Sequence, residues 1–284
     1  MKAWLQLVRA PAALTVLGDT VAGAAAAGSP LRGRRLVLPL SSALLYWSGM
    51  ALNDWADREL DAVERPERPI PSGRITARQA LAVAGGLSLA GLGLAAFAGG
   101  RDTVRVAAPL AAAIWAYDVK LKSTPAGPAA MALCRALDVT MGAGGARWKA
   151  AATPAAAVAA HTFGVTLLSR GEVHGGSRAS GQLALAGTVS SAVVAGGGRV
   201  DAPSHRLAAT VFALGYAGSV GSAQFAASQD PSAASVRKAT VAGIHGMVPL
   251  QAGLAARRGS LLGAALVACA LPLARRLSRK NSPT

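Results

Sequence analysis

A dense group of carboxylates follows the second apolar segment of this chain. Six of its thirteen acidic residues fall between positions 54 and 67, directly after a hydrophobic run at 36–52, although the 284-residue chain carries a formal net charge of +16. Carboxylates gathered at one end of an apolar segment indicate a bound cation. Hard oxygen donors suit Mg²⁺, which binds one or two carboxylates together with phosphate oxygens and water. The donors with helical spacing, which would share one face of a continued helix, are Asn53, Asp54, Asp57 and Asp61.

Two arginines beside this acidic segment indicate that the other partner of the metal is a phosphate. Arg65 and Arg68 lie in the sequence RPERP, and a guanidinium can hold a phosphate through two parallel hydrogen bonds. A structural alternative is a helix end that neutralises itself through i,i+4 pairs such as Asp54 with Arg58, each contributing about 0.3–0.5 kcal/mol. That alternative balances charge, but it does not explain an Asn-Asp pair followed by regularly spaced aspartates at the end of a membrane span.

The elements that would position these residues are membrane-spanning helices. The chain is 52% hydrophobic and 15% charged, and apolar windows of roughly 17–25 residues, long enough to cross a bilayer, recur along it. Abundant glycine and alanine would let such helices approach closely. We therefore predict an all-α, polytopic transmembrane helical bundle that forms one domain over residues 1–284. The candidate spans, with 235–253 the weakest, are 8–28, 36–54, 77–99, 103–119, 126–146, 153–171, 180–198, 205–227, 235–253 and 259–275, so nine or ten spans are both open.

The distribution of basic residues predicts the orientation of the bundle. With ten spans, the face that carries the amino terminus collects 17 Lys and Arg residues and the other face collects 11, although the arginines at 32–35 oppose the trend. The positive-inside rule places the first face in the cytoplasm. The acidic segment, the turn at 120–122 and the turn at 170–174 all fall on that face. We therefore expect these three polar segments to converge on one mouth of a protein in the cell membrane.

The acidic segment and its continuation resemble a known family. The pattern NDxxDxxxD from Asn53 to Asp61 is similar to the first aspartate-rich motif of the UbiA superfamily of intramembrane prenyltransferases, and RPERPIPSG at 65–73 resembles that family's loop between helices two and three. The segment from Arg9 to Asp19 also looks like the family's first helix. The resemblance implies about nine transmembrane helices around a central cavity, whose cytoplasmic mouth binds a prenyl diphosphate through Mg²⁺ held by two aspartate-rich motifs.

The resemblance also implies roles for individual residues. Asp54, Asp57 and Asp61 would be the catalytic carboxylates that hold the magnesium diphosphate, with Asn53 beside them. Tyr117 and Lys120, in the sequence AYDVKLKSTP, match a family turn with a tyrosine and a diphosphate-binding lysine, and Lys122 is expected to assist. The predicted diphosphate-binding set is Asn53, Arg65, Arg68, Tyr117, Lys120, Lys122 and Arg170, and the predicted metal ligands are Asn53, Asp54, Asp57, Asp61 and Glu172.

The second aspartate-rich motif is where this chain departs from the pattern. The family carries two aspartates four apart, whereas the corresponding stretch here reads TLLSRGEVHGG. It has one carboxylate, Glu172, flanked by Arg170 and His174. Glu172 would bind a second Mg²⁺, or Arg170 would replace that ion as a fixed cation on the diphosphate. The structural alternative is an ordinary cytoplasmic turn.

Ionisable residues inside the predicted spans are costly in lipid and must pair or face a cavity. We expect Arg135 to pair with Asp138 three residues later, Asp118 to orient Lys120, and His161 to be a hydrogen-bonded interior residue. The full set is Asp19, Asp118, Arg135, Asp138, His161 and His245. The two cysteines lie in apolar runs without metal spacing.

These observations favour an integral-membrane prenyltransferase that ionises a prenyl diphosphate with Mg²⁺ and passes the prenyl group to a lipophilic acceptor in the bilayer. A membrane terpene cyclase, which needs no acceptor, is the alternative, because the second aspartate-rich motif is incomplete. A transporter is disfavoured, since no internal repeat is visible. The positive charge suits membrane faces with anionic lipid and does not indicate nucleic acid as a partner.

Overall fold

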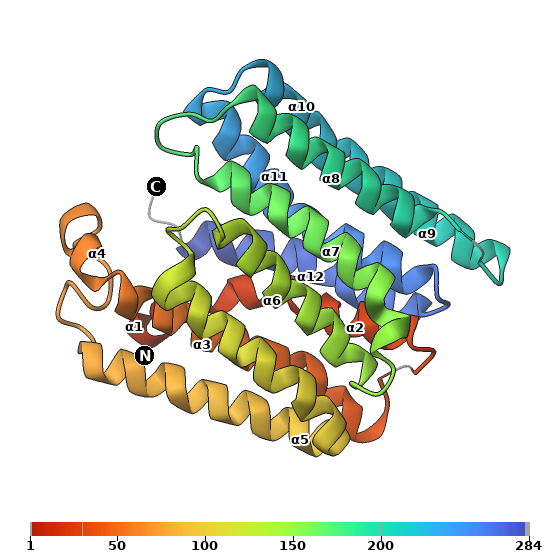
Figure 1. Ribbon diagram of the computed structural model, residues 1–284, viewed down its shortest axis with the longest axis horizontal. Helices are drawn as coiled ribbons and strands as arrows, with labels where there is room; N and C mark the ends of the chain where they lie inside the picture. Colours follow the sequence, from red (N-terminus) through yellow and green to blue (C-terminus); the bar gives the residue numbers. More distant parts are fainter. Residues whose placement is uncertain (1, 30, 199, 282–284) are drawn as a thin grey trace.

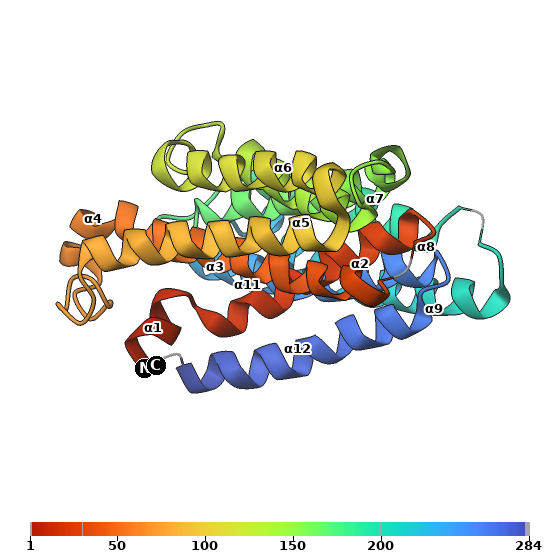
Figure 2. The same ribbon diagram turned by 90° about the horizontal axis from the view of Figure 1, so that it is seen from below.

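The long helices of this chain run side by side. The computed structural model describes residues 2–29, 31–198 and 200–281, and within these ranges the only regular elements are helices. Figure 1 shows the long helices packed along one common direction, and Figure 2 shows α12 (Leu261–Asn281) along one edge of the stack. The all-α fold class is confirmed for the described residues. That they form a single domain stays a prediction.

The amino-terminal half positions the acidic segment. It comprises α1 (Lys2–Leu7), the 3₁₀ helix η1 (Ala10–Thr15), α2 (Leu17–Ala26), η2 (Gly33–Val37), α3 (Leu38–Ala56) and the short α4 (Arg58–Glu64). Both η1 and α3 have a proline in their first turn, where its missing N–H costs no helical hydrogen bond. In Figure 1, α1 and α4 lie at the same end of the bundle.

Helix α5 (Ala77–Ala116) is two antiparallel helices joined by a sharp reversal. A straight helix of 40 residues would be about 60 Å long, twice the thickness of the hydrocarbon core. The chain turns back at Gly99 and Gly100, and Gly100 has a φ of 63°, a backbone conformation that glycine adopts without strain. This reversal separates the two predicted spans at 77–99 and 103–119. Thr76 caps the first helix in a capping box with Gln79.

The second segment of α5 continues into a π-helical turn, η3 (Tyr117–Leu121). The remaining elements are α6 (Gly127–Ala143), α7 (Trp148–Ser169), α8 (Arg178–Gly196), α9 (Pro203–Tyr216), the π turn η4 (Ala217–Gly221), α10 (Ser222–Gln229) and α11 (Ala233–Ala256). The helices follow the predicted segments closely. By length and apolar composition alone, however, three described helical segments qualify as membrane spans, namely Gly33–Ala56, Ala77–Leu121 and Trp148–Ser169. Several of the other helices are shorter than a span, among them α2 with 10 residues and α9 with 14.

Close packing through glycine joins α2 to α6. A Cβ on Gly23 would overlap the backbone carbonyl of Val139, and a Cβ on Gly142 would overlap the backbone of Thr20. Small residues at such crossings let two helix backbones touch. The packing role predicted from glycine content does not extend to every glycine, because a Cβ on Gly85 would meet nothing within 4 Å. The α2–α6 crossing fixes the depth at which the polar residues of both helices meet.

The three polar segments predicted to converge lie at one end of the bundle. Figure 1 shows α4 at the end from which α6 starts and at which α7 finishes. The guanidinium of Arg170 donates to the backbone carbonyls of Lys122, at 3.3 Å, and of Thr124. The backbone carbonyl of Glu172 accepts a hydrogen bond from Arg237 at 2.8 Å. These contacts tie the turns together.

Candidate active site

The acidic segment lies at the junction of α3 and α4. The α-helix stops at Ala56, and Asp57 (φ −89°, ψ 5°) separates the two helices. Helical hydrogen bonding nevertheless carries across the break, from Asp57 N to Asn53 O at 2.9 Å and from Asp61 N to Asp57 O at 2.8 Å. The predicted continuous helical face therefore divides into two pairs of side chains with different partners.

Arg68 joins one of these pairs. Its Nη1 lies 2.6 Å from Oδ2 of Asp61 and 3.5 Å from Oδ1 of Asp54, and both carboxylates are buried, with exposed fractions of 1% and 4%. Arg9 adds a second guanidinium, with Nη2 3.0 Å from Asp54 Oδ1. Arg65, four residues after Asp61, places its Nη1 3.6 Å from Asp61 Oδ1.

The charge balance of this segment is therefore made largely by long-range contacts. Arg58, predicted to neutralise Asp54 under the structural alternative, pairs with Glu59 and stacks on Trp55 instead. The two buried carboxylates thus depend on arginines from outside their own helices.

The second pair faces the π turn η3. Lys122 Nζ lies 2.7 Å from Asp57 Oδ1, and Asn53 Nδ2 donates to Asp118 Oδ1 at 3.4 Å. Lys120, predicted as the principal lysine, is exposed and makes no ion pair with the described residues. Asp118, predicted to orient Lys120, contacts Asn53 instead. The acidic segment is thereby connected to the helix that leads into α6.

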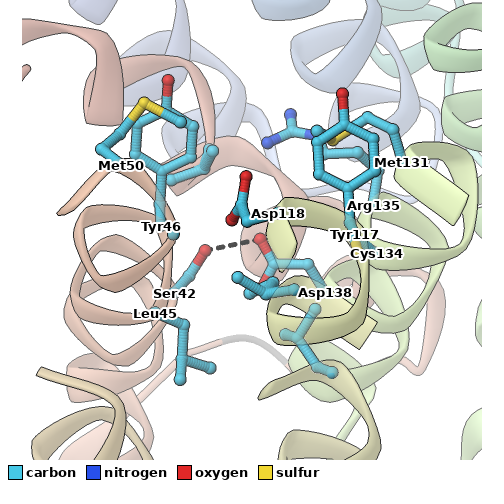
Figure 3. A pocket seen from close by; sticks show the side chains of 14 residues that line it. Ser42, Leu45, Tyr46, Met50, Tyr117, Asp118, Met131, Cys134, Arg135 and Asp138 are labelled. Atoms are coloured by element: carbon cyan, nitrogen blue, oxygen red, sulfur yellow. Dashed lines mark hydrogen bonds between the residues drawn. The ribbon is translucent and has the colours of Figure 1, made fainter. Parts of the chain in front are cut away.

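A pocket opens beside this charged cluster. It runs between α3, the end of α5 with η3, and α6, and its cavity volume is about 80 Å³. Figure 3 shows Tyr46 and Met50 facing Tyr117 and Met131, with the carboxylate of Asp118 between them. Deeper in the pocket, Ser42 donates a 2.5 Å hydrogen bond to Asp138. Tyr117 thus lies in the pocket wall, next to the cluster.

The segment at 170–174 lies near the cluster but makes no ion pair with its carboxylates in the described part of the chain. Arg170 is bound to the turn that carries Lys122. The side chain of Glu172 makes no hydrogen bond or ion pair with the described residues, and only its backbone carbonyl is bound, by Arg237. Whether these two residues bind a metal or a diphosphate stays a prediction.

The ionisable residues of α2 and α6 pair between helices rather than along one helix. Arg135 was expected to pair with Asp138, but its Nη2 lies 3.1 Å from Asp19 Oδ2 and donates to Thr15 O at 3.0 Å. Gln251 Nε2 donates to the other oxygen of Asp19 at 2.7 Å. The α2–α6 crossing brings Asp19 to Arg135, which is why spacing along α6 gave the wrong partner.

His161 is a hydrogen-bonded interior residue, as predicted. Its Nδ1 lies 2.7 Å from the hydroxyl of Tyr216, and its Nε2 lies 3.0 Å from the backbone carbonyl of Gly243. Both ring nitrogens are therefore engaged inside the bundle, away from the charged cluster.

The donor chemistry of the acidic segment fits Mg²⁺, although the protein alone does not enclose an ion. No group of three or more His, Cys, Asp or Glu side chains in the described ranges is arranged around a common point. Mg²⁺ needs only one or two carboxylates when phosphate and water complete its shell. Asp61 Oδ1 is buried and accepts no hydrogen bond from the described residues, and its ion-pair contact with Arg65 Nη1 is long, at 3.6 Å, so the protein engages this oxygen only weakly.

Sequence reasoning missed Arg9 and Asp118 as members of the site. Arg9 is the one non-glycine residue with positive φ (46°) among the described residues, and this conformation accompanies its contact with Asp54, 45 positions away. An arginine two residues before a proline, both interrupting an apolar run, was the available signal. Asp118 was visible as an intramembrane acid, but nothing in the sequence showed that it faces a pocket.

Known proteins are similar to this chain in sequence and in fold. Residues 14–228 match the model of the UbiA prenyltransferase family. The chain is 38% identical over 126 residues to the digeranylgeranylglyceryl phosphate synthase of Methanopyrus kandleri, covering 44% of this chain and 46% of that protein. It is 32% identical over 123 residues to the bacteriochlorophyll synthase 33 kDa chain of Rhodobacter capsulatus, covering 42% and 40%. The matches thus span less than half the length of these relatives.

Two solved structures are similar in fold. One, described as giving structural and mechanistic insights into digeranylgeranylglyceryl phosphate synthase in membranes, has a TM-score of 0.64 at 18% identity and covers 92% of this chain and 98% of that one. The other, the apo structure of a UbiA homologue from Aeropyrum pernix K1, has a TM-score of 0.66 at 15% identity and covers 85% and 96%.

Proposed function

Because this chain belongs to the UbiA prenyltransferase family, we propose that it is a membrane enzyme that ionises a prenyl diphosphate and transfers the prenyl group to a lipophilic acceptor. The observation that carries the proposal is the cluster of three carboxylates and three cations, Asp54, Asp57, Asp61, Arg9, Arg68 and Lys122, which adjoins a pocket inside the bundle.

The cations of the cluster bind the diphosphate. When the bond between the prenyl carbon and oxygen breaks, its electron pair moves to the diphosphate, and Arg9, Arg68 and Lys122 stabilise the charge that develops there. Such fixed charges act strongly because they need no reorganisation during the reaction. In the free protein the same three side chains pair with the carboxylates, so binding exchanges one set of ion pairs for another.

The carboxylates Asp54, Asp57 and Asp61, with the amide oxygen of Asn53, would hold Mg²⁺. Bound there, the ion would supply Lewis-acid stabilisation of the leaving diphosphate. The carboxylates also hold Arg68 and Lys122 in place before substrate arrives.

The pocket places the acceptor beside the reacting carbon. It begins at Tyr117 and Asp118, immediately next to the residues that bind the diphosphate, and is walled by Met50, Ile114 and Met131. These three apolar side chains would limit the access of water to a carbocation. The name digeranylgeranylglyceryl phosphate synthase denotes a product in which geranylgeranyl groups are joined to a glyceryl phosphate, which favours transfer over the terpene-cyclase alternative.

The charged end of the bundle faces the cytoplasm in this proposal. Lys and Arg number 17 on that face against 11 on the other when ten spans are counted. Water-soluble Mg²⁺ and diphosphate would reach and leave the site there.

Product analysis tests the proposed function. Purified protein is incubated with Mg²⁺ and prenyl diphosphates of graded chain length, with and without a panel of quinone, phenol and lipid-alcohol acceptors. Asp54→Asn serves as the inactive variant, and Asp102→Asn, which alters an exposed acid paired with Arg105, as the matched control. A prenylated acceptor formed by wild type and Asp102→Asn supports the proposal. A cyclic product formed without acceptor would replace it with the cyclase alternative.

A further inference from the structure

The end of the bundle opposite the acidic segment carries a basic surface with a single carboxylate. Figure 1 shows the reversal of α5 at the end away from α4. The turn between α6 and α7 touches this reversal, since a Cβ on Gly145 would overlap the backbone of Asp102. Segments 27–36, 99–105 and 143–150 contain only this one acidic residue, and it is paired with Arg105. The basic residues of this surface, called the basic end below, are Arg32, Arg34, Arg35, Arg101, Arg105, Arg147 and Lys149.

Two guanidiniums of the basic end contact the same residue. Arg35 donates to the backbone carbonyl of Ser29 at 3.1 Å, and Arg147 donates to the hydroxyl of that serine. Arg35 also donates to Gly142 O at 2.8 Å, and Arg147 to Ala27 O at 2.9 Å, which are carbonyls at the carboxyl ends of α6 and α2. Two such helix ends supply about one negative charge together, against two positive charges. Neither guanidinium has a carboxylate partner in the described ranges, so the pair keeps positive charge for an external anion.

Exposed aromatic and aliphatic side chains lie directly beside these cations. Lys149 Nζ lies 5.8 Å from the centre of the Trp148 ring, and the guanidinium carbon of Arg34 lies 6.0 Å from the centre of the Phe97 ring. Both rings are about half exposed, and Leu36 is 63% exposed. Aromatic rings next to Lys and Arg are typical of the head-group region of a bilayer. An anion that fits this surface therefore has a charged part for the arginines and an apolar part for the adjoining helix surface.

We propose that the basic end binds the phosphate of an anionic phospholipid, whose acyl chains lie along the exposed apolar surface beside Leu36 and Phe97. Arginine suits a phosphate because its planar guanidinium can donate two parallel hydrogen bonds. A free phosphate ion would leave the apolar surface without a partner, which favours the lipid. The arginines at 32–35, which oppose the charge rule for orientation, thereby have a role of their own: they hold this end of the bundle at the head groups, independently of catalysis at the other end.

Quenching of Trp148 fluorescence by brominated lipids tests this assignment at the surface itself. The protein is reconstituted in phosphatidylcholine bilayers that contain brominated phosphatidylglycerol or, for comparison, brominated phosphatidylcholine. The signal of Trp148 is the difference between the protein and its Trp148→Phe variant. We expect phosphatidylglycerol to bind beside Trp148 at least about fivefold more tightly than phosphatidylcholine, the factor that one cation near an anionic lipid supplies. Arg35→Gln combined with Arg147→Gln should reduce this preference to less than about twofold.

A charge-matched control separates this surface from the net charge of the protein. Arg178→Gln combined with Lys238→Gln removes two exposed cations near the starts of α8 and α11, at the other end of the bundle, and should leave the preference unchanged.

A second variant covers the case in which the arginine variant does not fold. Arg34→Gln combined with Lys149→Gln removes two cations that make no hydrogen bond to the described residues, and it should at least halve the preference. Equal binding of the two lipids to wild type, an unchanged preference in the variants of the basic end, or an equal loss in the charge-matched control would each overturn the inference. Inorganic phosphate that displaces the brominated lipid more strongly than chloride at equal ionic strength would assign the surface to a free anion and overturn the lipid assignment.

Discussion

Lys122, and not Lys120, contacts the acidic segment, since its Nζ lies 2.7 Å from Asp57 Oδ1 while Lys120 is exposed. Both lysines lie in the sequence KLK, so the difference comes from the π turn and the packing of η3 against α3. In our proposal this contact places a fixed cation where the diphosphate leaves.

Replacing the two lysines separately should therefore have unequal effects. Lys122→Ala should lower kcat by about 10²–10³-fold, because it removes one preorganised group that stabilises the leaving anion. Lys120→Ala should change kcat by less than about threefold, since an exposed charge is screened by solvent. Steady-state kinetics with a saturating prenyl diphosphate measures both. Equal losses in the two variants would argue against the assignment of Lys122.

Arg68 should contribute to stability as well as to binding, because it is shared by two buried carboxylates. Arg68→Ala leaves Asp54 and Asp61 with weaker compensation and should cost about 3–5 kcal/mol in the free energy of unfolding. Arg58→Ala breaks an exposed pair with Glu59 and should cost less than about 1 kcal/mol. Unfolding in detergent at fixed pH compares them. Similar midpoints for the two variants would show that the buried pairs are not formed in the free protein.

Adding a side-chain carbon to a glycine at the crossing of α2 and α6 should destabilise the protein. Gly23→Ala would press a methyl group on the Val139 carbonyl and should destabilise the protein by about 1–3 kcal/mol. Gly85→Ala, where a Cβ meets nothing within 4 Å, should shift stability by less than about 1 kcal/mol. The same unfolding measurement applies, and a stable Gly23→Ala protein would contradict the close approach of these helices.

The sidedness of the site can be tested by cysteine labelling. The background is a variant in which Cys134 and Cys269 are replaced. In this background the substituted cysteine of Glu67→Cys should react with a membrane-impermeant maleimide in inside-out vesicles. Lys149 is exposed at the opposite end of the bundle, so the cysteine of Lys149→Cys should react with the same maleimide in right-side-out vesicles. Reaction from the reverse sides would place the charged mouth outside the cytoplasm.

Much of this fold was predictable because its strongest signals are local. Apolar runs marked the helices to within a few residues, and the reversal at Gly99–Gly100 fell at the predicted end of the span 77–99. The pattern from Asn53 to Asp61 identified the acidic segment, although the break at Asp57 divides these residues into two pairs.

The partners of the acidic residues were not predictable in the same way. Arg9 reaches Asp54 across 45 positions, and Arg135 pairs with Asp19 across the α2–α6 crossing rather than with Asp138 on its own helix. Those choices depend on which helices pack together. The packing of α2, α3 and α6 depends on the whole bundle. The spacing of residues along one sequence does not show which helices lie next to each other.

The most direct test of the central claim is the Mg²⁺-dependent release of diphosphate from a prenyl diphosphate by the purified protein, comparing wild type with Asp57→Asn and with the control Asp102→Asn. We predict release by wild type and by Asp102→Asn, and at least about 10²-fold slower release by Asp57→Asn, because its carboxylate positions Lys122 and would hold the metal. Release by Asp57→Asn at the wild-type rate would contradict the assignment of the charged cluster as the site of ionisation.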